Sequence, residues 1–251
     1  MPALSDVQAY QASVDDVSTL TLAELLRFWR GLDAADAVPA AVDVRDFLPD
    51  LVDAYSPLSS EVAASFYDES RAAANAPGSF LADLAPARSV DKLQHMISWA
   101  VAPLFRVDPK TDLVAPDPDL ALSRLSSGTQ LEIADSARDT IDLNIEADQD
   151  LGHPRFARHA SANACAFCAL MATRGAVFRT AASAGSGHKY HAHCHCVAYP
   201  VFPGEGDESP DYVLGWERAY RDARKAARKS GIKAPGLSDV LPYMRQSLGA
   251  A

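Results

Sequence analysis

All four cysteines of this 251-residue chain lie within 32 consecutive positions, as Cys165-x-x-Cys168 and Cys194-x-Cys196. Six of the seven histidines lie in the same part of the sequence, between positions 153 and 195. A Cys-x-x-Cys pair presents two thiolates from a turn or helix start. A Cys-x-Cys pair does so from an extended segment, because side chains two apart share a face of a strand. Tetrahedral zinc takes four sulfur or nitrogen ligands, so the spacing predicts a structural metal site.

A fifth candidate ligand is His191, which gives the second half of the motif the form His191-x-x-Cys194-x-Cys196. An ordinary structural zinc site takes only four of these five groups, and the remaining group would then hydrogen-bond to a ligand. The sequence leaves the choice among the five open. In an extended segment, His193 and His195 would face away from the thiols, so we expect them to be surface residues.

Composition restricts the classes of protein that this chain can belong to. Apolar residues make up 48% and charged residues 22%, which is typical of a soluble globular protein. The sequence shows no signal peptide and no bilayer-spanning stretch, which predicts a cytosolic protein with reduced thiols. A net charge of −10 argues against a protein that binds nucleic acid with its whole surface, and leaves room for a local basic patch.

Apolar residues at helical spacing occupy most of the first 150 residues. Thr21-x-x-Glu24 has the form of a capping box and predicts the start of a helix that ends near Gly31. A second helical pattern runs over about 39–52, and we expect Pro49 to disturb it.

Three more helical segments are predicted before the cysteines. One would begin at Ser59 or Ser60, and another at Ser89, because serine is a good helix N-cap. The proline-containing stretch 106–118 predicts a joint before a last helical segment over 120–145.

Changes in composition divide the chain into three parts. We expect a helical domain over 1–150, a Cys/His module over 151–203, and an acidic linker with a basic helical tail over 204–251. The predicted fold is therefore mainly α (α+β): a helical region, a small zinc-organised β-hairpin module and a C-terminal helix.

The stretch from Trp216 to Lys233 carries seven basic and two acidic residues. Its basic side chains would wrap around much of a helix. Such a helix could bind DNA or an acidic protein surface, with salt-sensitive affinity. Alternatively it is a solvated helix that balances the acidic linker before it. The residues concerned are Arg218, Arg221, Arg224, Lys225, Arg228 and Lys229.

Three stretches, 155–158, 162–178 and 190–200, resemble the MuF-like minor head proteins of tailed bacteriophages, most closely those of actinobacterial phages. The family pattern is Cys-x-x-Cys, a short glycine-containing insert, and His-x-x-Cys-x-Cys followed by an apolar strand and a proline. The resemblance covers about 50 of the 251 residues. The pattern maps onto Cys165, Cys168, Gly175, His191, Cys194, Cys196 and Pro200.

This resemblance implies a structural virion protein that is present in few copies and takes part in head morphogenesis. It would lie inside the head near the portal, after assembly in the host cytoplasm. The implied partners are the portal protein and the major capsid protein, with packaged DNA as a further partner of the basic stretch. The implied cofactor is structural zinc.

A capsid maturation protease is a competing hypothesis, because similar phage proteins sometimes carry that label. A cysteine protease would pair Cys165 or Cys168 with His191. That arrangement leaves the remaining thiols unexplained, whereas a metal site uses all four.

Two more enzyme hypotheses use the cysteine and histidine region differently. A serine protease would use Ser183 or Ser186 with His188, but their Gly/Ser-rich loop lacks a nucleophile elbow. A metal-dependent nuclease needs an open coordination position, which four protein ligands would close. The final hypothesis, without catalysis, is a zinc-containing DNA-binding virion protein.

Overall fold

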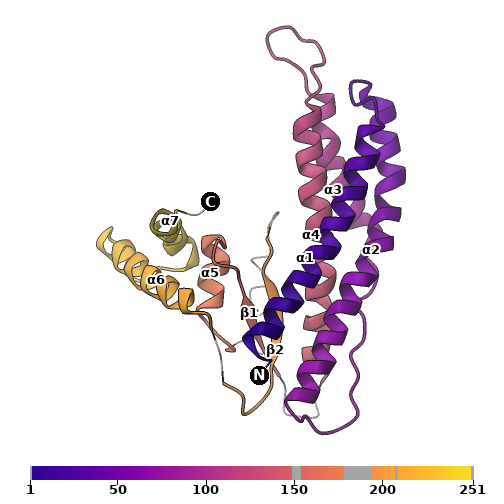
Figure 1. The fold of residues 1–251 in the computed structure, drawn as a ribbon. Coiled ribbons are helices and arrows are strands. Elements are labelled where there is room, and N and C mark those ends of the chain that lie inside the picture. Colours follow the sequence, from indigo (N-terminus) through magenta and orange to yellow (C-terminus); the bar gives the residue numbers. More distant parts are fainter. Residues whose placement is uncertain (1, 149–153, 178–193, 207–208, 250–251) are drawn as a thin grey trace.

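The computed structural model describes residues 2–148, 154–177, 194–206 and 209–249. Long helices form a bundle on one side of the molecule, three shorter helices lie on the other side, and two strands lie between them (Figure 1). In chain order the elements are α1 (Leu4–Arg30), α2 (Ala37–Ala73), α3 (Val90–Val101), η1 (Ala102–Phe105), α4 (Pro118–Ala147), β1 (Arg155–His159), α5 (Ala166–Ala172), β2 (Val197–Val201), α6 (Asp211–Lys229) and α7 (Leu237–Leu248).

The prediction of a mainly helical fold with a small β component is confirmed. The β component is an antiparallel pair, in which Arg155 lies opposite Val201 and His159 opposite Val197. The C-terminal region contains two helices, α6 and α7, where one was expected. None of the helices in the described part of the chain combines the length and apolar character needed to cross a membrane.

Helix α1 begins 17 residues before the predicted capping box. Thr21 lies inside the helix, fully buried, and its hydroxyl donates to the carbonyl of Val17 at 2.8 Å. The predicted start was therefore wrong. The helix extends toward the N-terminus because an earlier apolar stripe is buried against α2 and α4. This stripe consists of Val7, Tyr10, Val14 and Val17.

Helix α2 is continuous where two separate helices were expected. It contains both Pro49 and Pro57. Each proline leaves the carbonyl four residues earlier without a partner. Those carbonyls belong to Arg45 and Asp53, which are exposed, so that water can replace the missing hydrogen bonds. Burial of one long apolar stripe against the bundle outweighs the cost of two prolines on the solvent side.

The connections of the bundle agree with the sequence. Ser89 caps α3 by accepting a hydrogen bond from the backbone N–H of Lys92 at 3.4 Å. The predicted joint at 106–118 is a loop with one bridge, between Val107 and Val114. It ends where Asp117 caps α4.

The core consists of three clusters along the molecule. One fills the part of the bundle made by the C-terminal half of α1, the first half of α2, α3 and the start of α4. A second joins α1, α2 and α4 to both strands, so that β1 and β2 pack into the bundle itself. A third joins α5, α6 and α7 and contains three of the four cysteines. The cysteines therefore lie where the strands meet the helices that follow them.

A buried ion pair connects α2 to the end of α4. Arg71 Nε lies 2.9 Å from Asp148 Oδ2, and their side chains are 7% and 0% exposed. The hydroxyl of Tyr67 donates to the same carboxylate oxygen at 3.2 Å. Because Asp148 is the C-cap of α4 and β1 is the next element, this pair fixes the end of α4 from which the chain continues to β1.

Replacement of Arg71 by alanine would leave the Asp148 carboxylate buried without its cation. We expect the variant to lose about 3–5 kcal/mol of unfolding free energy, measured by urea denaturation. The control is Arg106→Ala, since Arg106 pairs with Asp117 on the surface, where its side chain is 62% exposed. That variant should change stability by less than about 1 kcal/mol. Equal losses in both variants would contradict the importance of the buried pair.

Candidate metal centre

Helix α5 places the first two cysteines. Cys165 is its N-cap, and the Cys165 sulfur accepts a hydrogen bond from the backbone N–H of Cys168 at 3.4 Å. All seven helical residues are buried, because this short helix packs against β1, α6 and α7. Cys168 points into this packing and is 1% exposed, whereas Cys165 is only partly buried.

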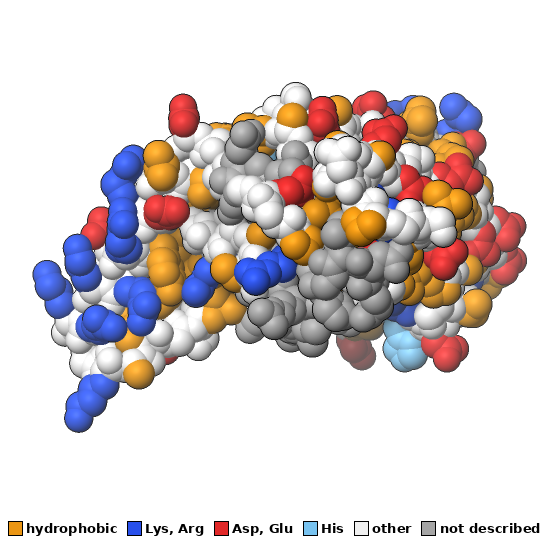
Figure 2. All heavy atoms as spheres, turned by 90° about the horizontal axis from the view of Figure 1, so that it is seen from below, with side chains coloured by type: hydrophobic (Ala, Val, Ile, Leu, Met, Phe, Trp, Pro, Cys, Tyr) orange, Lys and Arg blue, Asp and Glu red, His pale blue; other side chains and the backbone are white. Residues whose placement is uncertain are grey.

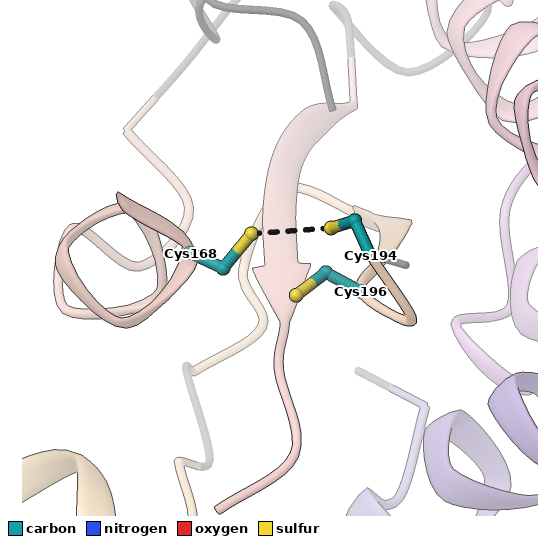
Figure 3. Close-up of side chains that lie close together, drawn as sticks. All are labelled: Cys168, Cys194 and Cys196. Carbon is teal, nitrogen blue, oxygen red and sulfur yellow. Dashed lines mark hydrogen bonds between the residues drawn. The ribbon is translucent and has the colours of Figure 1, made fainter. Parts of the chain in front are cut away.

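Cys194 and Cys196 lie in the segment that runs directly into β2. Both are buried, with the exposed His195 between them. This alternation is that of an extended chain, in which residues two apart face the same side. Figure 3 shows the two side chains turned toward Cys168 from α5.

The three buried thiols form one cluster. The sulfur atoms of Cys168, Cys194 and Cys196 all lie within 4.8 Å of one another. The sulfur atoms of Cys168 and Cys194 are 3.3 Å apart. All four cysteines of the chain are free thiols in this structure. The fold thus brings together two cysteines, Cys168 and Cys194, that are 26 residues apart in the sequence.

The other two predicted ligands have different positions. Cys165 is not part of the 4.8 Å cluster and lies beside it, on the same turn as Cys168. His191 lies outside the described residues. The structure therefore places three of the five candidates together and a fourth next to them.

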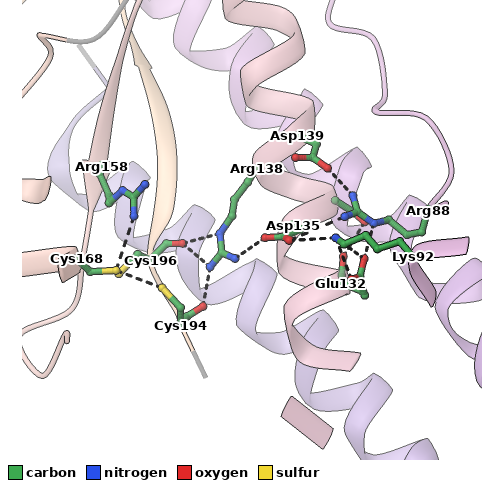
Figure 4. A network of polar contacts seen from close by, with 11 residues as sticks. Arg88, Lys92, Glu132, Asp135, Arg138, Asp139, Arg158, Cys168, Cys194 and Cys196 are labelled. Atoms are coloured by element: carbon green, nitrogen blue, oxygen red, sulfur yellow. Dashed lines mark hydrogen bonds and ion pairs between the residues drawn. The ribbon is translucent and has the colours of Figure 1, made fainter. Parts of the chain in front are cut away.

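Arg138 of α4 holds the segment that carries Cys194 and Cys196. Its Nη2 donates to the carbonyl of Cys194 at 2.6 Å and to that of Cys196 at 2.8 Å. Its Nε also donates to the carbonyl of Cys196, at 3.0 Å. The side chain is 2% exposed. A cation in the bundle core thus binds the backbone of the thiol-bearing segment directly (Figure 4).

Acidic residues on α4 orient this arginine. Asp135 Oδ1 accepts from Arg138 Nη1 at 2.9 Å. The other Asp135 oxygen lies 3.6 Å from Lys92 Nζ, and Glu132 binds both Lys92 and Arg88 at 2.9 Å. This charged network extends from the thiol-bearing segment across α4 to Lys92 of α3 and to Arg88, two residues before α3 (Figure 4). It fixes the Arg138 guanidinium in one position.

The residue between the two cysteines is held as well. Gln11 of α1 donates to the carbonyl of His195. The imidazole Nδ1 of His195 lies 2.8 Å from Asp15 Oδ1, and its Nε2 lies 3.1 Å from Gln130 Nε2. His195 therefore contacts α1 and α4. Helices of the bundle thus hold all three residues of this segment.

Two guanidinium groups influence the ionisation of the thiols. Arg158 Nη1 donates to the Cys168 sulfur at 3.8 Å. Hydrogen bonds from the thiols of Cys168 and Cys196 lower the pKa of Cys194, and the positive charge of Arg138 adds to this effect. Hydrogen bonds with Cys165 and Cys194, together with burial, raise the pKa of Cys168. The thiol hydrogen bonds and the charge of Arg138 therefore favour the thiolate form of Cys194.

The geometry of the cluster suits a soft metal ion. Four sulfurs at about 2.3 Å from a tetrahedral ion are roughly 3.8 Å apart. The Cys168 and Cys194 sulfurs are 3.3 Å apart, and all three sulfurs lie within 4.8 Å of one another. Among the described residues, the Cys168 sulfur contacts the Cys194 sulfur and the Arg158 guanidinium, and none of these contacts is with a histidine ring. Ser183, Ser186 and His188, which a serine protease would use, lie outside the described residues.

Sequence reasoning missed the groups that position the thiols. The signal for Arg138 was present, because it occupies a core position of α4 in line with Ala134, Ile141 and Ile145. A cation in an apolar stripe indicates a buried polar partner. For Gln11 and Asp15, 184 and 180 residues from the residue that they contact, the sequence carries no such signal.

Replacement of Arg138 by methionine should release the Cys194–Cys196 segment from the bundle. Hydrogen bonds from a charged donor contribute about 1.5–3 kcal/mol each, and about 1.4 kcal/mol corresponds to tenfold in an equilibrium. We expect Cys194 and Cys196 in chelator-treated protein to react with a thiol reagent roughly 10- to 100-fold faster than in the unmodified chain.

The matched control is Arg124→Met, on the same helix. Arg124 donates to the carbonyl of Trp99 and stacks over its ring, at the far end of α4 from the thiols. That variant should leave thiol reactivity unchanged. If Cys194 and Cys196 react with the thiol reagent in both variants at the rate of the unmodified chain, Arg138 does not hold the segment.

Comparison with known proteins places the chain in a family. The family described as VG15 protein matches residues 1–223, which include the bundle, both strands and all four cysteines. No curated protein and no solved structure gives a significant match. Since the match covers most of the sequence, this chain belongs to the VG15 protein family.

Proposed function

We propose that this chain is a structural minor head protein of a tailed bacteriophage, which assembles beside the portal during head morphogenesis. Two things support the proposal. The first is the resemblance to MuF-like proteins over the cysteine region, with the shared spacing of cysteines and histidine. The second is the cluster of three buried thiols that this spacing produces, held to a helical bundle by Arg138. This cluster is the observation that carries the proposal.

The cluster is proposed to hold zinc. Cys168, Cys194 and Cys196 supply three sulfur ligands, and Cys165 or His191 supplies the fourth. A bound zinc would supply a structural cross-link between α5 and the start of β2. The chain's own residues provide the buried thiols, the Arg138 clamp and the positive charge of Arg158, which favours thiolates. Structural zinc sites contribute on the order of 10 kcal/mol of apparent binding free energy.

Serine substitution tests this site. Cys168→Ser, Cys194→Ser and Cys196→Ser should each reduce bound zinc from about one ion per chain to near zero, because oxygen of a neutral hydroxyl is a poor zinc ligand. Elemental analysis of the purified chain measures this directly. In cobalt-substituted protein, the same variants should lose the thiolate charge-transfer absorption.

Two further variants complete the experiment. Cys165→Ser will lose zinc if its sulfur is the fourth ligand, and retain it if His191 has that role. Thr173→Ala removes a hydroxyl at the end of α5 that donates to the carbonyl of Leu170, and should leave the metal content unchanged. Full-length chain purified without metal, and unable to bind added zinc, would reject the metal site.

The assembly role is tested with the proposed partners. We expect the full chain, co-produced with the portal protein and major capsid protein of the same phage, to co-purify with the portal and to enter heads in few copies. Quantitative mass spectrometry of purified heads measures the copy number. Heads that exclude the chain would contradict the proposal.

The same experiment separates assembly from proteolysis. A structural protein leaves the major capsid protein at its full length whether or not the cysteines are intact. A maturation protease would shorten the capsid protein, and a catalytic-residue variant would abolish that cleavage. Intact-mass measurement of the capsid protein therefore distinguishes the two roles.

A further inference from the structure

Helix α6 has two faces of opposite character. Its buried face consists of Val213, Trp216, Ala219, Ala223 and Ala227, and packs against α5 and α7. At about 100° per residue, the six basic residues fall within about 140° of the remaining circumference. The expectation that they wrap around much of the helix was wrong, because helical periodicity gathers them on one side, opposite the buried face. They form one surface, the α6 basic face, which consists of Arg218, Arg221, Arg224, Lys225, Arg228 and Lys229.

Most of these charges are available to a partner. Every member of the α6 basic face is exposed except Arg224, which lies half-buried with its guanidinium over the Tyr220 ring. Lys225 pairs with Asp222 at 3.4 Å, and both side chains are more than 70% exposed. Within the described residues, Arg218, Arg221, Arg228 and Lys229 make no ion pair. Exposed pairs of the Lys225 type contribute little, so this face carries a nearly uncompensated positive charge.

The charge of the whole chain is strongly divided. Residues 1–150 contain 26 acidic and 10 basic residues, whereas residues 151–251 contain 7 acidic and 13 basic ones. Figure 2 shows blue side chains gathered at the end of the molecule formed by the C-terminal helices, and red ones gathered over the bundle. The chain as a whole has a net charge of −10, but the end formed by its C-terminal helices is basic.

The chemistry of the α6 basic face fits a polyanion better than a protein. From 218 to 229 the exposed positions of α6 include no large apolar side chain, and Leu214 lies one turn before this stretch. Protein interfaces generally need an apolar, desolvated centre. Duplex DNA presents one negative charge per about 1.7 Å of axis and is contacted mainly through arginine and lysine. The stretch 218–229 extends over about 16 Å, enough to follow several phosphates.

We propose that the α6 basic face binds the phosphate backbone of double-stranded DNA, without sequence preference. The choice of DNA as the polyanion rests on the proposed head role, whereas the existence of the surface does not. The acidic bundle is repelled by DNA, so contact is confined to the end of the molecule that α6 forms.

The test uses the full chain and a fluorescently labelled duplex of about 20 bp, with anisotropy measured over a series of salt concentrations. The quadruple variant Arg218→Gln, Arg221→Gln, Lys225→Gln and Arg228→Gln should bind roughly 10- to 100-fold more weakly near about 0.1 M salt. The slope of log affinity against log salt should fall by about 3–4, since each lost phosphate contact removes about 0.9.

A matched control removes four exposed basic residues from the bundle side, so that the net charge changes equally. This variant should bind DNA as the unmodified chain does. It carries Arg30→Gln, Arg45→Gln, Arg106→Gln and Lys110→Gln. In the opposite direction, Glu217→Gln with Asp222→Asn removes the acidic residues beside the α6 basic face and should strengthen binding. Circular dichroism checks that every variant is folded.

Three results would overturn the proposal. They are no measurable binding of the unmodified chain to duplex, equal loss in the bundle control, and binding to poly-glutamate as tight as binding to DNA. The last result would assign the face to an acidic protein surface. Failure here leaves the head role intact, because that role is tested by incorporation of the chain into heads.

Discussion

The contact between Arg138 and the carbonyls of Cys194 and Cys196 is the interaction on which the candidate site depends. A short segment before a strand has little apolar surface of its own and would otherwise sample many conformations. A buried guanidinium with several donors restricts it at two points. Arg138 lies on α4, which packs against α1, α2 and α3. The bundle therefore holds the backbone of Cys194 and Cys196 in a fixed position.

Burying a charge of this kind is costly unless its hydrogen bonds are satisfied. Here the Asp135 carboxylate neutralises the Arg138 guanidinium, and the carbonyls of Cys194 and Cys196 accept three further hydrogen bonds from it. The arrangement therefore specifies one position for the strand β2 relative to α4. A metal ion bound by the thiols would add a cross-link from that position to α5, and so to the basic end of the molecule.

The sequence predicted most of the helices, but it did not predict where several of them begin and end. The stripe over 120–145 and the serine cap of α3 were correctly identified because both signals are local. The helix start predicted at Thr21 and the disturbance predicted at Pro49 were wrong, because burial of the apolar stripes outweighed the local preferences of these residues. In α2 the carbonyls freed by proline face water, a fact that depends on which side of the helix packs inward.

The sequence by itself determined which chemistry is available: two thiol pairs at ligand spacing, and a basic run of known length. Only the tertiary structure decided which thiols meet and what holds them. Cys168 reaches Cys194 across 26 residues, and Gln11 reaches His195 across 184. Contacts between residues so far apart depend on how helices pack, and packing is set by the shape of the whole core rather than by neighbouring residues.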